Sequence, residues 1–321
     1  MKWDDIHHVL LGAMEKKFPE KAKLVEALSD ILFVEKGAIY RRLNGKVPFS
    51  FMEMVVIAEK LGISLDHLVH KDLLRTNHFV LKLVEYMNLD DIDFQHLDSF
   101  ISLIASAKGD PNSEKAETSN ILPIPFYAGF DSLTKYYLFK YQYLFSGTEN
   151  RMPYHDLAVP EKLYRKFRSF SDESRHTANS IYIWDYLIFQ YLVTDIQYFS
   201  GINLIAEDDV RQIREDLLAL VDYIEEITLT GCYEETGNRV SFYISDINFE
   251  ANYGCLQFND MHVSLVKTFI LNSVVSTDKR TFEKIKDWIQ SLKKSSTLIS
   301  QSGAVHRIDF FEKQRKIIEN L

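Results

Sequence analysis

Hydrophobic residues near the start of the chain recur at the spacing of amphipathic helices. A 3.6-residue period places the apolar side chains of each segment on one face, where they can pack against neighbouring segments. Ser50 and Glu53 form a capping-box pair ahead of the fourth segment, and Gly62 can end that segment in a left-handed conformation. The pattern predicts helices at Trp3–Phe18, Ala22–Leu32, Glu35–Asn44, Phe51–Leu61 and Leu65–His70.

The third segment, Glu35–Asn44, has an apolar face and a face suited to nucleic acid. Periodicity turns Ala38, Ile39 and Leu43 inward, and it turns Lys36, Gly37, Tyr40, Arg41 and Asn44 outward, with Arg42 on the boundary. Arginine suits the guanine edge and asparagine the adenine edge, whereas lysine and tyrosine commonly hold phosphate. An ordinary solvated basic helix is the alternative interpretation. The residues expected to approach bases are Lys36, Tyr40, Arg41 and Asn44, and those expected to hold the DNA backbone are Arg42 and Lys46.

This arrangement resembles the lambda-repressor-like (XRE-type) helix-turn-helix regulators over the first quarter of the chain. The recognition helix stands here as Ala38-Ile39-Tyr40-Arg41-Arg42-Leu43-Asn44-Gly45, and the family's later signature as Leu61-Gly62-Ile63-Ser64-Leu65-Asp66-His67-Leu68. The resemblance implies a DNA-binding domain over residues 1–75. Two positions depart from the family pattern, because Phe33 occupies a turn position where glycine is usual and Glu35 stands where serine or threonine usually caps the helix.

Later in the chain the hydrophobic period changes from 3.6 to 2. Turns are expected at Thr236-Gly237-Asn238 and Asn259-Asp260. The expected helices are 79–87, 94–107, 131–145, 160–170, 174–199, 208–227, 281–292 and 309–321, and the expected strands are 240–245, 247–253, 255–258 and 262–275. This order predicts an α+β fold in which a helical block precedes a small antiparallel sheet.

The clearest change in composition falls at Lys108–Asn120, which lacks large apolar residues and is rich in Gly, Pro, Ser and charge. We interpret it as part of a flexible linker over residues 108–121. The chain is then multi-domain, with an all-α domain at 1–75 and an α+β domain for assembly or effector sensing at 122–321. Residues 76–107 between them are expected to form a helical extension, either a dimer contact or a fused extension of the N-terminal helical core.

Charge is unevenly distributed along the 321 residues. The whole chain carries −9, whereas Met1–Arg75 has 12 basic and 11 acidic residues and the remainder carries −10. Any DNA contact must therefore come from the local basic face near the start, because electrostatic fields decay over ~8–10 Å in physiological salt. The modest affinity that follows favours a homodimer that binds two half-sites of double-stranded DNA.

Several classes of protein are not indicated by the sequence. Cys232 and Cys255 are far apart and in no metal-binding frame, so two reduced thiols are expected. No apolar run approaches the ~20 residues of a membrane span, which favours a cytoplasmic protein without a membrane partner. No phosphate-binding glycine loop, HExxH or GxSxG motif occurs, so we expect neither an enzyme nor a cofactor.

Two functions remain open at this point. The first is a sequence-specific transcription regulator, and the second is an adaptor whose helical N-terminus binds a partner protein and not DNA. Aromatic residues in the second half form either an apolar pocket for a small-molecule or protein effector or an ordinary core. These aromatic residues are Tyr182, Trp184, Tyr186, Phe189, Tyr191, Tyr198 and Phe199.

Overall fold

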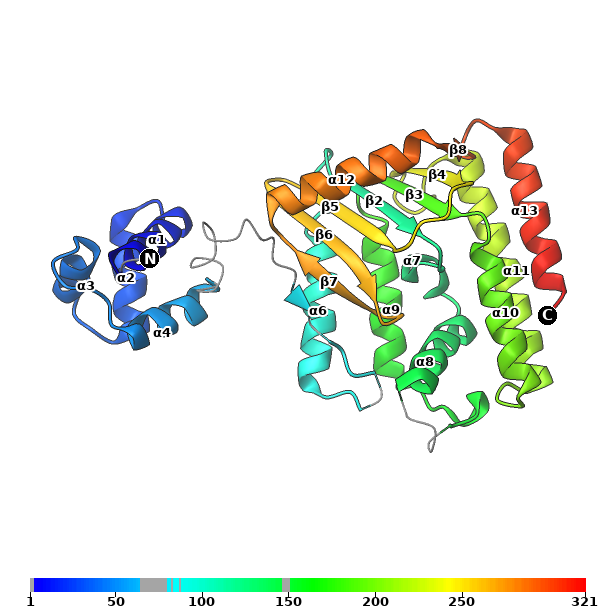
Figure 1. Cartoon of the computed structure of the whole chain (residues 1–321), viewed down its shortest axis with the longest axis horizontal. Coiled ribbons are helices and arrows are strands. Elements are labelled where there is room, and N and C mark those ends of the chain that lie inside the picture. Colours follow the sequence, from blue (N-terminus) through cyan, green and yellow to red (C-terminus); the bar gives the residue numbers. More distant parts are fainter. Residues whose placement is uncertain (1–2, 64–79, 82, 87, 146–150) are drawn as a thin grey trace. The chain divides into compact units, whose positions relative to one another are not determined.

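The computed structural model describes residues 3–63, 80–81, 83–86, 88–145 and 151–321. Contacts between residues divide the chain into two units, Met1–His78 and Phe79–Leu321, which are described separately below (Figure 1). The helix expected at Leu65–His70 lies outside the described residues.

Four short helices build the described part of the first unit. Their apolar faces meet in one core that contains Leu10, Leu28, Ile39 and Ile57, as the 3.6-residue period predicts. The capping box is confirmed, since Ser50 Oγ accepts from Glu53 N at 3.2 Å and Ser50 N donates to the Glu53 carboxylate at 2.7 Å. These helices are α1 (Trp3–Lys17), α2 (Lys21–Leu32), α3 (Lys36–Leu43) and α4 (Phe51–Leu61), within one residue of the predicted bounds.

A mixed sheet organises the second unit. The described residues form eight strands in the order β1-β7-β6-β5-β2-β3-β4-β8, in which β2, β3 and β4 are parallel and the other pairs antiparallel. The strands are β1 (Val80–Leu81), β2 (Glu114–Ser119), β3 (Asn179–Asp185), β4 (Arg239–Ser245), β5 (Tyr253–Phe258), β6 (Met261–Thr268), β7 (Asn272–Ser276) and β8 (Ser296–Leu298). The unit is therefore mixed α/β.

Parallel strands need long crossover connections, and those connections supply most of the helices. Because β2, β3 and β4 follow one another in one direction across the sheet, right-handed crossovers place both helical connections on the same face. The helices are α6 (Asp91–Ala105), α7 (Ile124–Tyr127), α8 (Asp131–Phe145), η1 (Tyr154–Asp156), α9 (Glu161–Ser174), α10 (Ile188–Gly201), α11 (Glu207–Thr230), α12 (Lys279–Lys294) and α13 (Ala304–Glu319).

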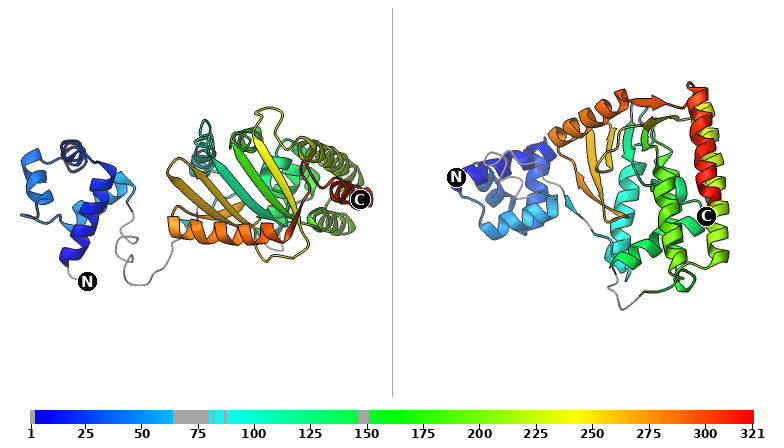
Figure 2. Two further views of the ribbon diagram at one scale, coloured as in Figure 1. Left: turned by 90° about the horizontal axis from the view of Figure 1, so that it is seen from above. Right: turned by 45° about the vertical axis from the view of Figure 1, so that its right-hand side comes forward.

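Helices cover both faces of the sheet (Figures 1 and 2). On one face α12 packs its residues Phe282, Ile289 and Leu292 against β2, β3 and β5. On the other face the core is rich in aromatic rings, with Trp184 and Phe242 packed against Phe126 of α7. A smaller cluster between α6 and strands β5 and β6 extends this second face.

The prediction of a flexible linker at residues 108–121 is wrong. The prediction of a small antiparallel sheet is also wrong, since the sheet is mixed and has eight strands in the described residues. Glu114–Ser119 is β2, which lies in the sheet between β3 and β5. The strand is almost entirely polar in sequence, and sheet pairing rather than apolar patterning holds it in place. Because residues on both sides of it pack into the same unit, the division of the chain falls at His78 and not near residue 108.

Four further expectations are corrected. The long helix predicted at 174–199 is a turn, the strand β3 and the helix α10. No helix occupies the described part of 79–87, where Val80 and Leu81 pair with β7 instead. The strand predicted at 247–253 is irregular up to Asn252, and the one at 262–275 is two strands, β6 and β7, joined by a turn at Phe269 and Ile270.

The described residues of the expected helical extension at 76–107 pack within the second unit. Phe100, Leu103 and Ile104 of α6 join the cluster beside β5 and β6, and Leu97 packs against the larger aromatic core. Where it is described, the segment therefore belongs to the core of the second unit and not to that of the N-terminal helices, and the dimer contact stays a prediction.

Candidate nucleic-acid interface

The turn between α2 and α3 sets the direction of the predicted recognition helix. Phe33 ends α2 in the left-handed conformation, with φ 54° and ψ 41°. Glu35 precedes α3 in an extended conformation and makes no side-chain cap, so helix α3 begins without the usual hydroxyl. Both departures from the family pattern are therefore accommodated, and the turn keeps the left-handed backbone that glycine normally provides.

Helix α3 has the phase predicted from sequence. Ile39 is fully buried against α2 and α4, whereas Ala38 and Leu43 are half-buried. Five of the six predicted interface residues are exposed: Lys36, Tyr40, Arg41, Asn44 and Lys46. The backbone just after the helix is held by Lys46 N, which donates to Arg41 O at 2.9 Å, so the structure brings Lys46 beside the end of α3.

The exposed residues differ in how free their side chains are. Lys36 Nζ is 3.1 Å from Glu26 Oε1, and the Asn44 side-chain oxygen accepts from Lys21 Nζ at 2.9 Å. Within the described part of the chain, the side chains of Arg41 and Lys46 form no hydrogen bond or ion pair. These two cations are thus available to a ligand without breaking a contact.

Arg42 is the exception among the predicted residues, because its guanidinium faces α4. Its Nη2 donates to Glu53 Oε1 at 2.7 Å and its Nε donates to Oε2 at 3.4 Å, and the two side chains are only 19% and 21% exposed. Burial alone would raise the pKa of Glu53, but hydrogen bonds from Ser50 and Arg42 outweigh it and hold the pKa below its usual value. The pair joins the end of α3 to the start of α4, so Arg42 positions the helix.

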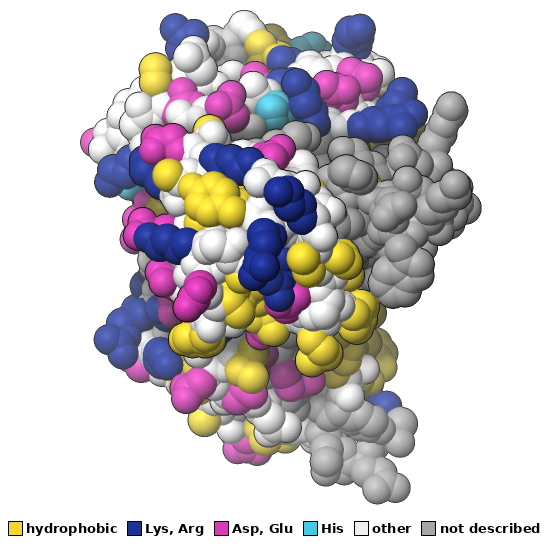
Figure 3. Space-filling model, turned by 90° about the vertical axis from the view of Figure 1, so that its left-hand side faces the viewer, with side chains coloured by type: hydrophobic (Ala, Val, Ile, Leu, Met, Phe, Trp, Pro, Cys, Tyr) yellow, Lys and Arg dark blue, Asp and Glu magenta, His cyan; other side chains and the backbone are white. Residues whose placement is uncertain are grey.

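Hydrophobic side chains lie among the cations on this unit (Figure 3). Phe33 is 93% exposed and Tyr40 is 42% exposed, and the loop and first turn of α4 add Val47, Phe51 and Met52. Sequence reasoning did not single out Phe51 and Met52, although both follow directly on the capping serine. A surface of this kind can contact the sugar and methyl groups of DNA or the apolar surface of a protein.

The aromatic residues of the second unit are mostly core. Tyr182, Trp184, Phe189 and Phe199 are buried in the large cluster, and Tyr186 packs partly against it. Tyr191 and Tyr198 point to solvent. These rings therefore do not form the pocket that was one of the two readings of the sequence.

Among the described residues, no group of three or more His, Cys, Asp or Glu side chains is placed to hold a metal ion. Cys232 and Cys255 are both free thiols. Among the helices that the structure describes, none combines the length and apolar character needed to cross a bilayer.

Comparison with known proteins gives no relative for this chain. No family model matches it, and neither a curated protein nor a solved structure is detectably similar to it. The functional inference therefore rests on the chemistry and geometry of helices α2 to α4.

Proposed function

We propose that the chain is a sequence-specific DNA-binding transcription regulator in which the N-terminal unit is an all-α helix-turn-helix domain. The observation that carries this proposal is the outward face of α3 and the turn after it, where Arg41 and Lys46 are exposed and, among the described residues, unpaired, while Ile39 anchors the helix from behind. A short helix of this form can enter the major groove. The protein acts in the cytoplasm, without a cofactor and without catalysing a reaction.

We assign each residue of the proposed interface a role in binding DNA. Arg41 donates to a guanine edge, Asn44 contacts an adenine, and Tyr40 and Lys36 reach neighbouring bases or phosphates. Lys46, beyond the helix end, holds a phosphate. Arg42 acts through Glu53, fixing the angle of α3 to α4 rather than touching DNA.

The test is binding of the full chain to DNA selected from a random library, followed by fluorescence anisotropy at two salt concentrations. Arg41→Ala is expected to lose about 1–3 kcal/mol on the selected site and to relax the base preference there. Lys46→Ala is expected to weaken all sequences alike and to reduce the salt slope by about 1.

Lys294→Ala provides the matched control, because it removes an exposed lysine of α12 in the other unit. It should leave affinity, preference and salt slope unchanged. Equal affinity and preference for wild type and Arg41→Ala would reject α3 as the reading helix.

A second function is favoured by the exposed apolar residues Phe33, Phe51 and Met52. In this alternative the unit is an adaptor that docks on a partner protein. The same selection distinguishes the two, because an adaptor yields no enriched DNA sequence and no salt-sensitive retention at either salt concentration.

A further inference from the structure

The interior strand β2 contains charged residues where a strand covered on both faces normally carries apolar ones. Lys115 and Glu117 project to the face covered by α6 and α9, whereas Ala116 between them packs in the cluster under α12. Lys115 is only 7% exposed. Charges of this kind oppose folding, so their place in the middle of a sheet indicates a role other than packing.

A small cavity lies beside these two side chains. Its volume is about 50 Å³, and its walls come from β2, β5, β6 and helices α6, α7 and α9. Apart from Lys115 and Glu117 the lining is mainly apolar, including Phe100, Leu103, Leu256 and Val263. A volume of this size is several times that of one water-sized probe, about 10–15 Å³, and is comparable with a molecule of a few heavy atoms.

The ammonium group of Lys115 has few partners. Its Nζ donates to the carbonyl oxygen of Ser174 at 3.2 Å and lies 5.1 Å from the centre of the Tyr182 ring. Within the described residues, no carboxylate oxygen lies within 4.0 Å of it. An ammonium has three protons to donate, and a buried one is stabilised mainly by an anion at contact distance.

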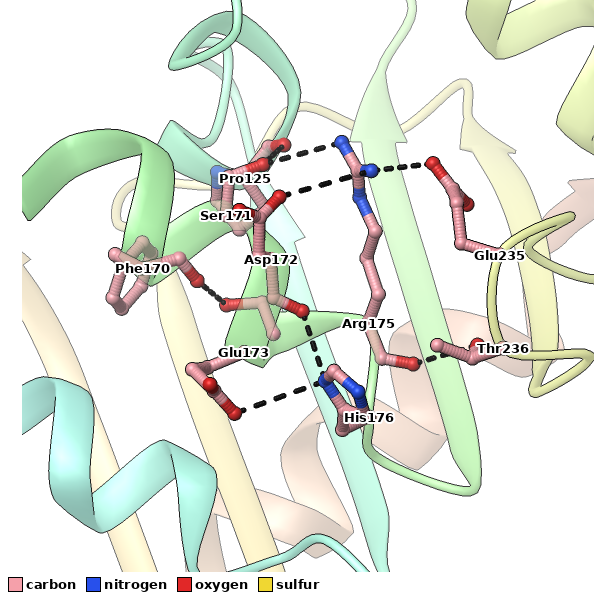
Figure 4. A network of polar contacts seen from close by, with 10 residues as sticks. Pro125, Phe170, Ser171, Asp172, Glu173, Arg175, His176, Glu235 and Thr236 are labelled. Carbon is pink, nitrogen blue, oxygen red and sulfur yellow. Dashed lines mark hydrogen bonds and ion pairs between the residues drawn. The ribbon is translucent and has the colours of Figure 1, made fainter. Parts of the chain in front are cut away.

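The Ser174 carbonyl that accepts this hydrogen bond belongs to the last residue of α9. The neighbouring residues Ser171 and Arg175 are held by contacts with other segments (Figure 4). Ser171 Oγ donates to Pro125 O at 2.6 Å, and Thr236 Oγ1 donates to Arg175 O at 3.0 Å. The guanidinium of Arg175 pairs with Glu235. These contacts tie the end of α9 to two other segments, so the Ser174 carbonyl cannot easily move to accommodate a different position of Lys115.

Glu117, the carboxylate that lines the cavity beside Lys115, is shared with a second ammonium group outside the lining. Glu117 interacts electrostatically with two ammonium groups, those of Lys115 and Lys267, and it accepts from Ser119 Oγ at 3.2 Å. Burial raises the pKa of Glu117 and lowers the pKa of Lys267. With all three groups ionised, the cluster carries one net positive charge, and Lys115 is the member that lines the cavity without a contacting anion.

We propose that this cavity binds a short-chain monocarboxylate, with its carboxylate against Lys115 Nζ and its alkyl group among Phe100, Leu103 and Leu256. One negative charge matches the excess charge of the cluster, and the apolar walls match a chain of a few carbons. Dicarboxylates and phosphates carry more charge than the cluster can balance. The site would give the second unit a ligand of its own, and this inference does not depend on the DNA-binding proposal.

The test is calorimetric titration of the full chain at pH 7 with acetate, propionate and butyrate, each compared with its neutral amide. One acid of the series is expected to bind at one site per chain at least about 10-fold more tightly than its amide, since a charge-assisted hydrogen bond distinguishes them. Lys115→Met should abolish that difference. Lys108→Met, which removes an exposed lysine of the same unit, should preserve it.

A second variant keeps the test informative if Lys115→Met does not fold. Ile104→Phe retains the ammonium and fills space beside it, so it should lose acid binding while circular dichroism stays unchanged. The proposal is overturned if no acid binds, if acid and amide bind equally, or if a folded Lys115→Met or Ile104→Phe chain binds as wild type does. Water alone in the cavity would give the first of these results.

Discussion

Phe33 adopts a left-handed backbone conformation, and among the described residues its side chain makes no buried contact that would compensate the energetic cost. Its φ of 54° is unfavourable for any residue with a Cβ, and its ring is 93% exposed, so burial returns little stability. Phe33→Gly should therefore raise the free energy of local opening at the α2 and α3 amides by about 0.5–1 kcal/mol. Hydrogen exchange of these amides would then be slower than in wild type. Phe33→Ala keeps the Cβ and should leave exchange near wild type. Equal behaviour of the two variants would mean that the ring, and not the backbone, determines the stability of this turn.

Lys115 lowers stability at neutral pH, and its contribution depends on pH in a defined direction. Burial lowers the pKa of its ammonium to about 8 from the ordinary value of 10.5, while Glu117 opposes the shift. Between these two values the unfolded chain binds a proton that the folded chain does not, so wild-type stability rises with pH over this interval. Below pH 8 the full cost of the buried charge is present.

Lys115→Met should consequently be more stable than wild type at pH 7, by about 1–3 kcal/mol. The difference should narrow as pH rises from about 8 toward 10.5, and above 10.5 the wild-type side chain is mostly neutral in both states. Urea unfolding followed by fluorescence of the buried Trp184 measures this directly. Lys108→Met serves as the exposed control and should show no such trend. A Lys115→Met chain less stable than wild type at pH 7 would contradict the argument.

At the scale of single elements, a backbone contact at the start of α13 restricts one position. A Cβ on Gly303 would lie 2.4 Å from the carbonyl oxygen of Leu298, and the residue has φ 71°. Gly237 has φ 68° with open space around it, so it shares the conformational cost without the clash. Gly237→Ala should destabilise by about 1 kcal/mol, and Gly303→Ala by about 2–4 kcal/mol, in urea unfolding. Similar losses for both would show that the Leu298 segment shifts freely.

Helices with one apolar and one polar face could be predicted from sequence. Strands that do not alternate between apolar and polar residues could not. The four N-terminal helices and α12 each carry apolar residues at helical spacing, and their bounds were found closely. β3 is buried along nearly its whole length, so Ile181–Trp184 shows no alternation of apolar and polar residues. Such a pattern is equally typical of a buried helix. β2 carries Lys115, Glu117 and Ser119, and its polar sequence is typical of a linker.

The candidate interface was more accessible to prediction than the cavity. The phase of α3 follows from the period alone, so the exposure of Tyr40 and Arg41 was foreseen. The pairing of Arg42 with Glu53 was not, because it depends on the angle between α3 and α4. The cavity beside Lys115 brings together residues from Phe100 to Leu265, and no local pattern reports contacts over such separations.

Over the whole molecule, charge limits the affinity for DNA that the proposed regulator could reach as a single chain. The chain carries −9 in total, and α3 with the residues after it offers few unpaired cations. Since each phosphate contact contributes to affinity through counterion release, a single helix of this kind binds weakly and with modest salt dependence. A regulator built this way gains affinity and specificity by placing two copies of α3 on one face of the duplex.

A homodimer predicts a strict dependence on the spacing between half-sites. Two recognition helices related by a two-fold axis fit half-sites about 10 base pairs, or ~34 Å, apart. Inserting about 5 base pairs between the half-sites of a selected operator turns one of them to the opposite side of the duplex. Anisotropy titration should then show affinity reduced toward that of a single half-site, at least about 10-fold weaker. An operator with the same number of central base pairs replaced and none inserted should bind as before, because α3 would still meet both half-sites. Unchanged affinity after insertion would mean that one copy binds alone, and the affinity would then have to come from contacts outside α3.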